Sequence, residues 1–248
     1  YRRDWAKPDF AEGDRVILHF GAVDQSCTVY INGLRAFRHR GGYLPFEFDA
    51  TGFLSKDVNE ISLSVRDLSD TSYHSRGKQR LKRGGIWYTP QSGIWQTVWA
   101  ECIPHDCIRQ LHITPDFDKA CVNVRADTVG DSRAYAVFDG RQYQLPASIP
   151  VPDFEPWSPE NPRLYDFTVI CSEDRVESYF AMRKFSVEAD SEGVKRLFLN
   201  GRPYFHNGLL DQGYWSDGMY TAPSDEALIF DIQTAKDMGF NMLRKHIK

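Results

Sequence analysis

Short runs of strictly alternating apolar and polar side chains are the feature of this sequence that most constrains its fold. Residues 59–65 alternate position by position, and the runs 15–20 and 26–31 are also short and rich in apolar residues typical of strands. A period of two places one set of side chains on the buried face of a sheet and the other set in water. Asn32-Gly33 follows one run directly and favours the positive φ angles of a two-residue hairpin. These patterns predict a β-sandwich of jelly-roll type over residues 1–103.

A second series of short strands begins after Pro104, which marks a boundary. A proline-rich crossing, residues 146–162, interrupts this series, and the sequence lacks the Cys…Trp…Cys arrangement of antibody domains. A small immunoglobulin-like β-sandwich is therefore predicted over residues 104–187. Its expected strands are 108–113, 120–125, 134–138, 164–170 and 177–180.

The remaining segment, residues 188–248, has a different character. It contains a second hairpin signal at Asn200-Gly201, and Ser224 can then cap a helix whose first turn is acidic. Apolar residues follow at helical spacing until Gly239, which suits the end of a helix, and a compact apolar run follows at 240–244. A helix between two strands predicts the first β/α unit of a barrel. Because a complete (β/α)8 barrel needs ~250 residues, the predicted TIM barrel is truncated.

Charge and hydropathy exclude two classes of partner. The 34 acidic residues outnumber the 30 basic ones, the net charge is -4, and there is no basic face to neutralise phosphates. A nucleic-acid partner is therefore not expected. No apolar run approaches the ~20 residues that a membrane-spanning helix needs, so no membrane partner is expected either.

The cysteines and aromatic residues limit the chemistry further. The 5 cysteines form no CxxC pair, so the sequence predicts buried free thiols, no metal site and no cofactor. Aromatic residues make up 14% of the chain. Packing in an all-β core is the favoured explanation, and stacking on the apolar faces of sugar rings is compatible with it.

The start of the chain leaves its location open. The first residue is not Met, and the sequence opens inside a structured region, so we expect a further N-terminal segment. The compartment stays undetermined, with secretion or the periplasm favoured for the full-length protein. Assembly into a homo-oligomer is left open.

Four patches follow one another along nearly the whole chain, and together they resemble glycoside hydrolase family 2. This is the family of β-galactosidases, β-glucuronidases and β-mannosidases. Residues 20–49, with Gly21-Ala22-Val23-Asp24 and Tyr30-Ile31-Asn32-Gly33, resemble its sugar-binding domain, and residues 92–99 resemble the strand that ends it. Residues 156–165 resemble the family's Trp-Ser-Pro-x-x-Pro-x-Leu-Tyr stretch. Residues 199–244 resemble the entry to its barrel.

The resemblance implies a retaining double displacement. One Glu protonates the leaving oxygen while a second Glu attacks the anomeric carbon. Both glutamates are expected beyond Lys248, so this chain is predicted to hold no catalytic residue and to be inactive alone. The implied function is part of a retaining exo-β-glycosidase that hydrolyses terminal β-linked sugars. A β-galactosidase is favoured over a β-glucuronidase or a β-mannosidase.

Arg244 and His246 are candidate substrate-binding residues because they follow an apolar barrel strand. Barrel chemistry lies at the carboxyl ends of strands, and the resemblance implies an Arg at this place near the sugar. The His is displaced by one position from the family pattern. The alternative is that Lys245, His246 and Lys248 are simply solvated at the end of the chain.

Further candidate substrate-binding residues are Asp211, Gln212 and Trp215, which follow the first predicted barrel strand. An acid, an amide and an aromatic ring suit hydroxyl hydrogen bonding and ring stacking, although an ordinary polar loop explains them equally well. Trp87 and Tyr88 lie in a long basic, glycine-rich loop, residues 69–93, that the resemblance implies can reach the barrel mouth. For these two residues the alternative is a contact between domains.

Two aspartates in the first sandwich are assigned structural roles. Asp24 and Asp49 are both expected to bond the backbone of nearby loops.

Two other functions remain open from the sequence. A non-catalytic carbohydrate-binding module explains the sandwiches, and so does a structural or adhesive β-protein. Neither has a use for the single β/α unit, which would expose apolar side chains such as Leu228 and Ile232. A carbohydrate is the partner expected under both the enzyme and the binding-module hypotheses.

Overall fold

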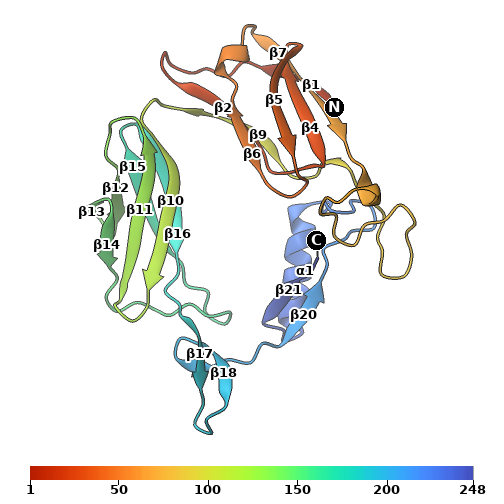
Figure 1. The fold of residues 1–248 in the computed structure, drawn as a ribbon. Helices are drawn as coiled ribbons and strands as arrows, with labels where there is room; N and C mark the ends of the chain where they lie inside the picture. The colour runs from red at the N-terminus through yellow and green to blue at the C-terminus, as the bar shows by residue number, and fades with distance from the viewer. Residues whose placement is uncertain (248) are drawn as a thin grey trace. The chain divides into compact units, whose positions relative to one another are not determined.

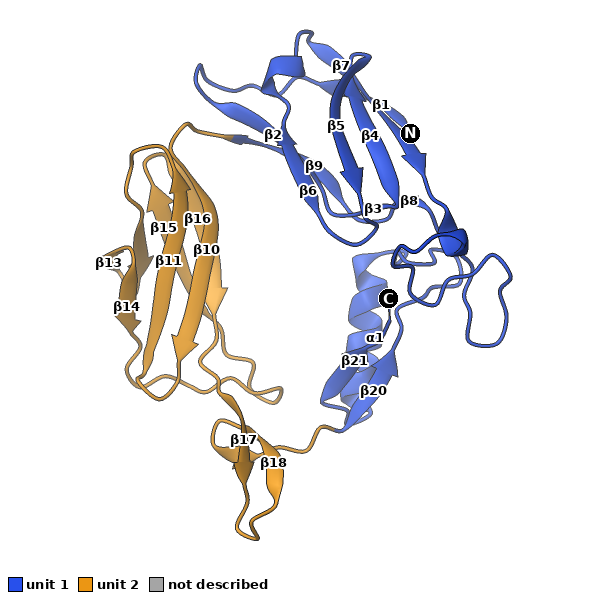
Figure 2. Ribbon diagram, in the orientation of Figure 1, with its two compact units in different colours: residues 1–102, 207–248 blue, residues 103–206 orange. Residues whose placement is uncertain are grey.

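The computed structural model describes residues 1–247 and shows a mainly β chain with two compact units (Figure 1). Unit 1 comprises residues 1–102 and 207–248, and unit 2 comprises residues 103–206 (Figure 2). Lys248 lies outside the described residues. The mainly β prediction is confirmed, whereas the domain boundaries predicted at 103/104 and 187/188 stay predictions.

The first part of unit 1 is a β-sandwich. One sheet has the strand order β1-β7-β4-β5 and the other the order β6-β2-β9, and a short pair, β3-β8, lies beside them. The apolar side chains of β2, β4, β6 and β7 form one core between the two sheets. The strands are β1 (Arg2–Ala6), β2 (Arg15–Phe20), β3 (Val23–Asp24), β4 (Ser26–Ile31), β5 (Leu34–Arg40), β6 (Phe46–Asp49), β7 (Val58–Arg66), β8 (Gly93–Ile94) and β9 (Val98–Ile103), with 3-10 turns at Thr51–Phe53 and Ser69–Thr71.

The predicted hairpin at Asn32-Gly33 is confirmed. Ile31 pairs with Leu34, so only two residues form the connection, and φ is 51° at Asn32 and 80° at Gly33. Positive φ at both central residues is the geometry that matches the twist of the flanking strands. Every second residue of β4 is buried, as its alternating sequence requires.

Unit 2 contains a second sandwich of two facing sheets. Their strand orders are β10-β11-β14 and β13-β12-β15-β16, and the core between them includes Val122, Ile149, Phe167 and Phe180. The seven strands are consistent with the predicted immunoglobulin-like fold. They are β10 (Cys107–Asp116), β11 (Cys121–Val129), β12 (Tyr135–Phe138), β13 (Arg141–Gln144), β14 (Ala147–Pro150), β15 (Tyr165–Cys171) and β16 (Asp174–Phe180).

A small sheet ends unit 2. Its strands are β17 (Phe185–Ala189), β18 (Lys195–Leu199) and β19 (Arg202–Pro203), in that order. The second predicted hairpin is confirmed here, because Leu199 pairs with Arg202 and both Asn200 and Gly201 have positive φ.

The predicted β/α unit is present in unit 1. Strand β20 (Gly208–Asp211) pairs in parallel with β21 (Met242–Lys245), and helix α1 (Asp225–Asp237) connects them in sequence (Figure 1). The Ser224 hydroxyl accepts a hydrogen bond from the Ala227 N–H at 3.3 Å, so it caps the helix as predicted. Parallel strands require such a crossover connection.

The apolar face of α1 is largely exposed within the described structure. Leu228, Ile229, Ile232 and Met238 each keep at least 41% of their surface accessible, and only Ala235 is buried. The helix therefore covers one side of the β20–β21 pair with a small residue and leaves its larger apolar side chains uncovered.

The described residues contain no helix that is both long and apolar enough to cross a bilayer. All five cysteines are free thiols, and four of them are buried. Cys102 is exposed, which departs from the expectation of burial.

Candidate functional site

Tyr220 lies at the centre of a polar and aromatic cluster that joins loop 69–93 to the segment between β20 and α1. Its side chain is 2% exposed, and its hydroxyl lies 2.6 Å from the hydroxyl of Tyr43. The Gln79 side-chain N–H donates to the same hydroxyl at 2.9 Å. Burial raises the pKa of Tyr220 far above its usual range. The hydroxyl therefore stays protonated and can both donate and accept.

Two glutamines extend this cluster through backbone contacts. The Tyr220 N–H donates to the side-chain oxygen of Gln91 at 2.6 Å, and the Gln91 N–H donates to that of Gln79 at 2.7 Å. The Thr221 hydroxyl also donates to the Trp95 carbonyl at 3.0 Å. Buried amides are stable only when such partners are present. The long loop is consequently ordered against the β/α unit.

A pocket of about 440 Å³ opens beside this cluster, between the β20–β21 pair and α1. Its lining includes three residues that the sequence analysis predicts to bind substrate, Asp211, Gln212 and Tyr88. Tyr214 also lines it. The Gln212 side-chain oxygen is buried and has no hydrogen-bond partner in the described structure. A buried polar atom without a partner is costly, so a ligand hydroxyl that reached this oxygen from the pocket would relieve that cost.

Asp211 is the last residue of β20, whereas the sequence analysis placed it after the strand. The strand therefore ends later in the sequence than expected, and the Asp211 carbonyl accepts from the His246 N–H at 2.8 Å. The Asp211 carboxylate forms an ion pair with Lys245 and accepts from the Gly213 N–H at 2.7 Å. It is therefore already partnered on two sides.

Tyr88 stacks on Tyr214 with ring centroids 3.7 Å apart and an interplanar angle of 6°. This contact brings loop 69–93 to the rim of the pocket. Trp87 instead carries the guanidinium of Arg80 over its ring, 3.8 Å from the centroid. Of these two predicted residues, Tyr88 lines the pocket and Trp87 supports the loop.

The other predicted residues lie outside the lining of this pocket. Trp215 is half-buried and its backbone forms a bridge with Met219. Arg244 is exposed on β21, opposite Leu210 in the register, and His246 is half-buried just beyond that strand. In the part of the chain that the structure describes, neither Arg244, His246 nor Trp215 is among the residues lining this pocket.

Asp24 is a buried carboxyl that the sequence analysis treated as structural. It is 4% exposed, and its Oδ1 has no hydrogen-bond partner, so the expectation that it bonds loop backbone is wrong. A Cβ at Gly42 would lie 2.4 Å from Oδ1, which is why glycine is needed there. Burial, and next the charge of Asp67, raise the pKa of Asp24 to about 7.

Asp49 behaves as expected. Its Oδ1 accepts from the Thr51 N–H at 2.9 Å and from the Thr51 hydroxyl at 2.6 Å. It fixes the turn after β6.

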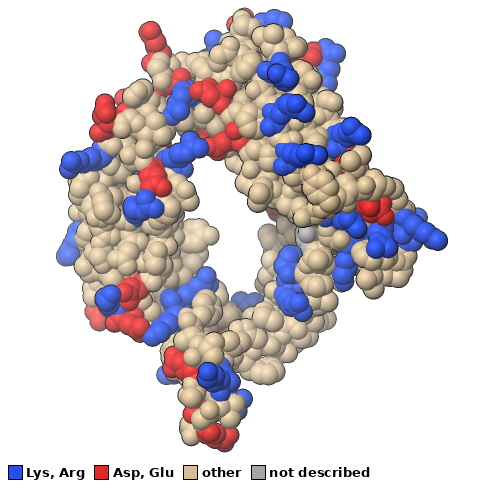
Figure 3. All heavy atoms as spheres, viewed as in Figure 1, with Lys and Arg blue, Asp and Glu red and all other residues tan. Residues whose placement is uncertain are grey.

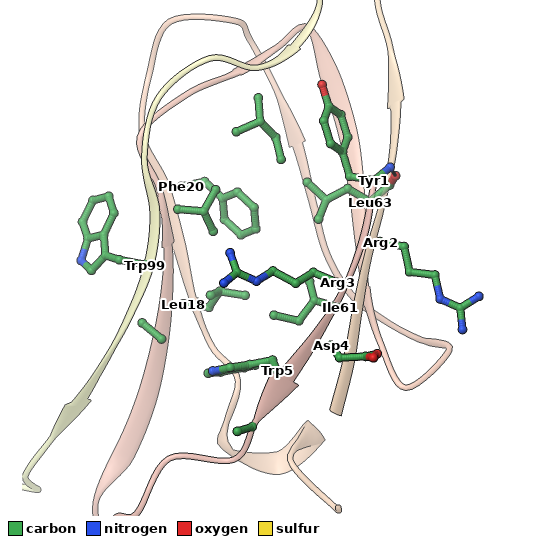
Figure 4. A pocket seen from close by; sticks show the side chains of 14 residues that line it. Tyr1, Arg2, Arg3, Asp4, Trp5, Leu18, Phe20, Ile61, Leu63 and Trp99 are labelled. Carbon is green, nitrogen blue, oxygen red and sulfur yellow. Dashed lines mark hydrogen bonds between the residues drawn. The ribbon is translucent and has the colours of Figure 1, made fainter. Parts of the chain in front are cut away.

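A second pocket, of about 640 Å³, lies between the two sheets of the first sandwich, where β1 and β9 are edge strands. Figure 4 shows the Arg3 guanidinium pointing toward Leu18 and Phe20, with Trp5 and Leu63 among the other walls. These walls are mostly apolar and offer few acceptors for sugar hydroxyls. The pocket beside Gln212 is therefore the better candidate for sugar binding.

No group of three or more His, Cys, Asp or Glu side chains within residues 1–247 is arranged to hold a metal ion.

Comparison with known proteins shows which family the first sandwich resembles. The model for "Glycosyl hydrolases family 2, sugar binding domain" matches residues 1–99, which cover the first sandwich. This chain carries that sugar binding domain. The resemblance to family 2 is thereby confirmed.

Relatives extend the similarity beyond the sugar binding domain. A putative beta-glucuronidase of Formosa agariphila is 26% identical over 98% of this chain and 32% of its own length. A beta-galactosidase of Thermoanaerobacter pseudethanolicus is 23% identical over 84% of this chain and 31% of its own length. The chain thus spans about a third of the length of these curated relatives.

Solved structures agree in fold. The beta-glucuronidase of Bacteroides uniformis is 25% identical, with a TM-score of 0.75, and the match covers 98% of this chain and 32% of that one. The beta-glucuronidase of Ruminococcus gnavus in complex with D-glucuronic acid has a TM-score of 0.80 at 19% identity, covering 98% and 46%. The similarity includes both sandwiches and the β/α unit that follows the sugar binding domain.

Several residues around the sugar binding domain were missed by sequence reasoning. Tyr220 forms hydrogen bonds with Gln79 and with Gln91, each more than a hundred positions away in the sequence. No local sequence pattern marks residues that pair over such a separation. Asp24 was noticed but assigned wrongly. The Asp24 side chain lies against the backbone of Gly42, which belongs to the Gly41-Gly42 pair. A pair of glycines can mark a place where a side chain approaches the backbone closely, and this was the available signal.

Ionisation of Asp24 should make the stability of the sugar binding domain pH-dependent. The folded-state pKa of about 7 exceeds the ordinary value of 3.8, so the contribution of Asp24 to stability is fully present below about pH 4 and is lost as the pH rises through about 7. We expect Asp24→Asn to raise the thermal unfolding midpoint at pH 8, with a gain that shrinks toward pH 4. Thermal denaturation followed by circular dichroism across this range measures both values.

Asp49→Asn is the matched control. It removes one charge at an exposed position and keeps an Oδ1 that accepts both hydrogen bonds from Thr51, so the midpoint at pH 8 should change little. An Asp24→Asn variant whose midpoint at pH 8 rises no more than that of Asp49→Asn would contradict the account of Asp24.

Proposed function

We propose that this chain is the front part of a retaining exo-β-glycosidase that removes terminal β-linked sugars. The observation that carries the proposal is the family 2 sugar binding domain followed by a parallel β20–α1–β21 unit. A binding module or an adhesive sandwich gives no role to that unit. The proposed domains are residues 1–103, 104–187 and 188–248.

The proposed chemistry is divided between this chain and the remainder of the protein. Retaining glycosidases use two carboxyl groups about 5–5.5 Å apart, one as acid and one as nucleophile. We assign both to the part of the relatives' length that this chain does not span. Residues 1–248 contribute contacts to the sugar and do not break the glycosidic bond.

The proposed sugar contacts surround the pocket beside Gln212. The buried side-chain oxygen of Gln212 accepts a sugar hydroxyl, and the Tyr88–Tyr214 stack offers an aromatic edge to the ring. Asp211, Trp215, Arg244, His246 and Trp87 complete the proposed set. Arg244 is exposed, and the sequence places it at the carboxyl end of a barrel strand, where substrate groups bind.

The terminal sugar is proposed to be β-galactose or β-glucuronate. Relatives of similar identity carry the names beta-galactosidase and beta-glucuronidase. Their names support both sugars and favour neither.

Activity should require the complete protein. The purified 248-residue chain should release no nitrophenol from nitrophenyl β-galactoside or β-glucuronide, because it lacks the acid and the nucleophile. The full-length protein should hydrolyse one of the two, with retention of anomeric configuration followed by NMR. Turnover by the isolated chain would refute the assignment of both glutamates to the remainder of the protein.

Gln212 should matter for substrate use in the full-length protein. A lost hydrogen bond inside a binding site costs about 1–3 kcal/mol, so Gln212→Ala should lower kcat/KM by about 10- to 100-fold. Gln233→Ala is the control, since Gln233 lies on the exposed surface of α1 and bonds Asp237 at 2.7 Å. Equal kcat/KM for both variants would remove Gln212 from the site.

A further inference from the structure

The outer face of the sheet β1-β7-β4-β5 carries arginines that the proposed sugar site does not use. The alternation of β4 buries Cys27, Val29 and Ile31 and turns Ser26 and Thr28 outward. On β5, Phe37 and His39 stack against Phe46 or Phe48 of the core, so the intervening Arg38 and Arg40 face solvent. The same period on β7 places Ser64 and Arg66 outward.

The register brings these residues into two rows across the sheet. Ser26 lies opposite Arg40 on one side and opposite Arg66 on the other. Thr28 lies opposite Arg38 and Ser64 in the next row. Neighbouring strands are about 4.8 Å apart. The two rows therefore hold three guanidinium groups around a floor of small hydroxyl side chains.

These residues line a groove of about 650 Å³. Its described lining also includes Gln25, Leu68 and His39 but no acidic residue. His39 adds no positive charge at neutral pH, because burial lowers its pKa from the ordinary value of 6.5 and outweighs the opposing effect of its contact with the Gly41 carbonyl. The positive charge of the groove comes from arginine alone.

The three arginines are available to a ligand. Arg38, Arg40 and Arg66 are exposed, and none of their side chains has an ion-pair or hydrogen-bond partner within residues 1–247. By contrast, Arg2 on the edge strand β1 of the same sheet forms an ion pair with Glu60. Figure 3 shows Lys and Arg side chains gathered over the face formed by β4, β5 and β7. A protein with a net charge of -4 thus concentrates unpaired positive charge on one sheet face, so the expectation from the sequence that no basic face is present is wrong.

We propose that this arginine groove binds an acidic glycan through the carboxylates of its uronate residues. The planar fork of a guanidinium matches a carboxylate bidentately. Serine and threonine hydroxyls can bond sugar hydroxyls between the charged groups. The exposed Leu68 at the groove margin offers apolar contact to a ring face.

A glycan fits the groove better than a nucleic acid. The groove belongs to a sugar binding domain, and its lining has no aromatic side chain besides His39, whose ring packs on Phe46. Single-stranded nucleic acids are held by aromatic stacking platforms along a basic path. Three arginines over a hydroxyl floor lack such platforms. The groove is separate from the Gln212 pocket, so its role does not depend on which sugar the enzyme cleaves.

Binding titrations of the purified chain test the proposal directly. The probes are a fluorescently labelled oligogalacturonate, a neutral oligogalactose, a sulfated oligogalactose without carboxylates and a single-stranded oligonucleotide. We expect the oligogalacturonate to bind, the neutral oligosaccharide to bind at least tenfold more weakly, and affinity for the uronate to fall with added salt. The triple variant Arg38→Ser, Arg40→Ser, Arg66→Ser should lose at least tenfold in affinity.

A matched triple variant controls for net charge. Arg133, Arg141 and Arg202 are exposed in unit 2, and changing them to Ser removes the same three charges. This control should bind the oligogalacturonate as the unmodified chain does. If both triple variants bound the oligogalacturonate equally weakly, net charge alone would explain the loss of affinity. That result would overturn the proposed site. A preference for the oligonucleotide or the sulfated probe over the uronate would overturn the ligand assignment. Circular dichroism of each variant verifies that the sheets are intact.

Discussion

The buried hydroxyl of Tyr220 is the interaction on which the arrangement of unit 1 depends. It lies between the Tyr43 hydroxyl and the Gln79 amide, in a place from which water is excluded. A buried polar atom that loses its partner costs roughly 1–3 kcal/mol, so each member of this set stabilises the position of the others. The set joins the core sandwich, the long loop and the β/α unit through side chains from three separate regions of the sequence.

This constraint explains why a loop of about 25 residues can be ordered without regular structure. Loops of that length in compact domains are commonly functional. Here Gln79 and Gln91 bond each other and Tyr220, and Tyr88 stacks on Tyr214. The loop is therefore held at the rim of the pocket that contains Gln212. The loop belongs to the first sandwich and is fixed by the β/α unit, so both contribute side chains to the lining of this pocket.

Local signals in the sequence predicted the elements well, because their causes are local. Asn32-Gly33 and Asn200-Gly201 adopt the positive φ angles that define their hairpins, and Ser224 caps α1 through a contact three residues away. The parallel pairing of β20 with β21 followed from the strand–helix–strand pattern. Asp211 was placed outside its strand, and the partner of its carbonyl, the His246 N–H, lies far along the chain.

The interior of the site was not predictable in the same way. The Tyr43–Tyr220 pair spans 177 positions and the Gln79–Tyr220 pair spans 141. Neither tyrosine stands out from the 12 in the sequence. Asp24 shows the opposite problem. Its residue type suggested a loop-bonding role, whereas the fold leaves its Oδ1 buried against Gly42 without a partner.

A double-mutant cycle on the two tyrosines tests most directly whether their contact holds unit 1 together. Tyr43→Phe and Tyr220→Phe each remove one hydroxyl and little volume, so the coupling between them isolates their mutual hydrogen bond. Urea denaturation should give a coupling free energy of about 1 kcal/mol or more. Tyr220→Phe combined with Tyr179→Phe, on the exposed surface of β16, should be additive. Additivity of the Tyr43 and Tyr220 variants within about 0.3 kcal/mol would contradict the account.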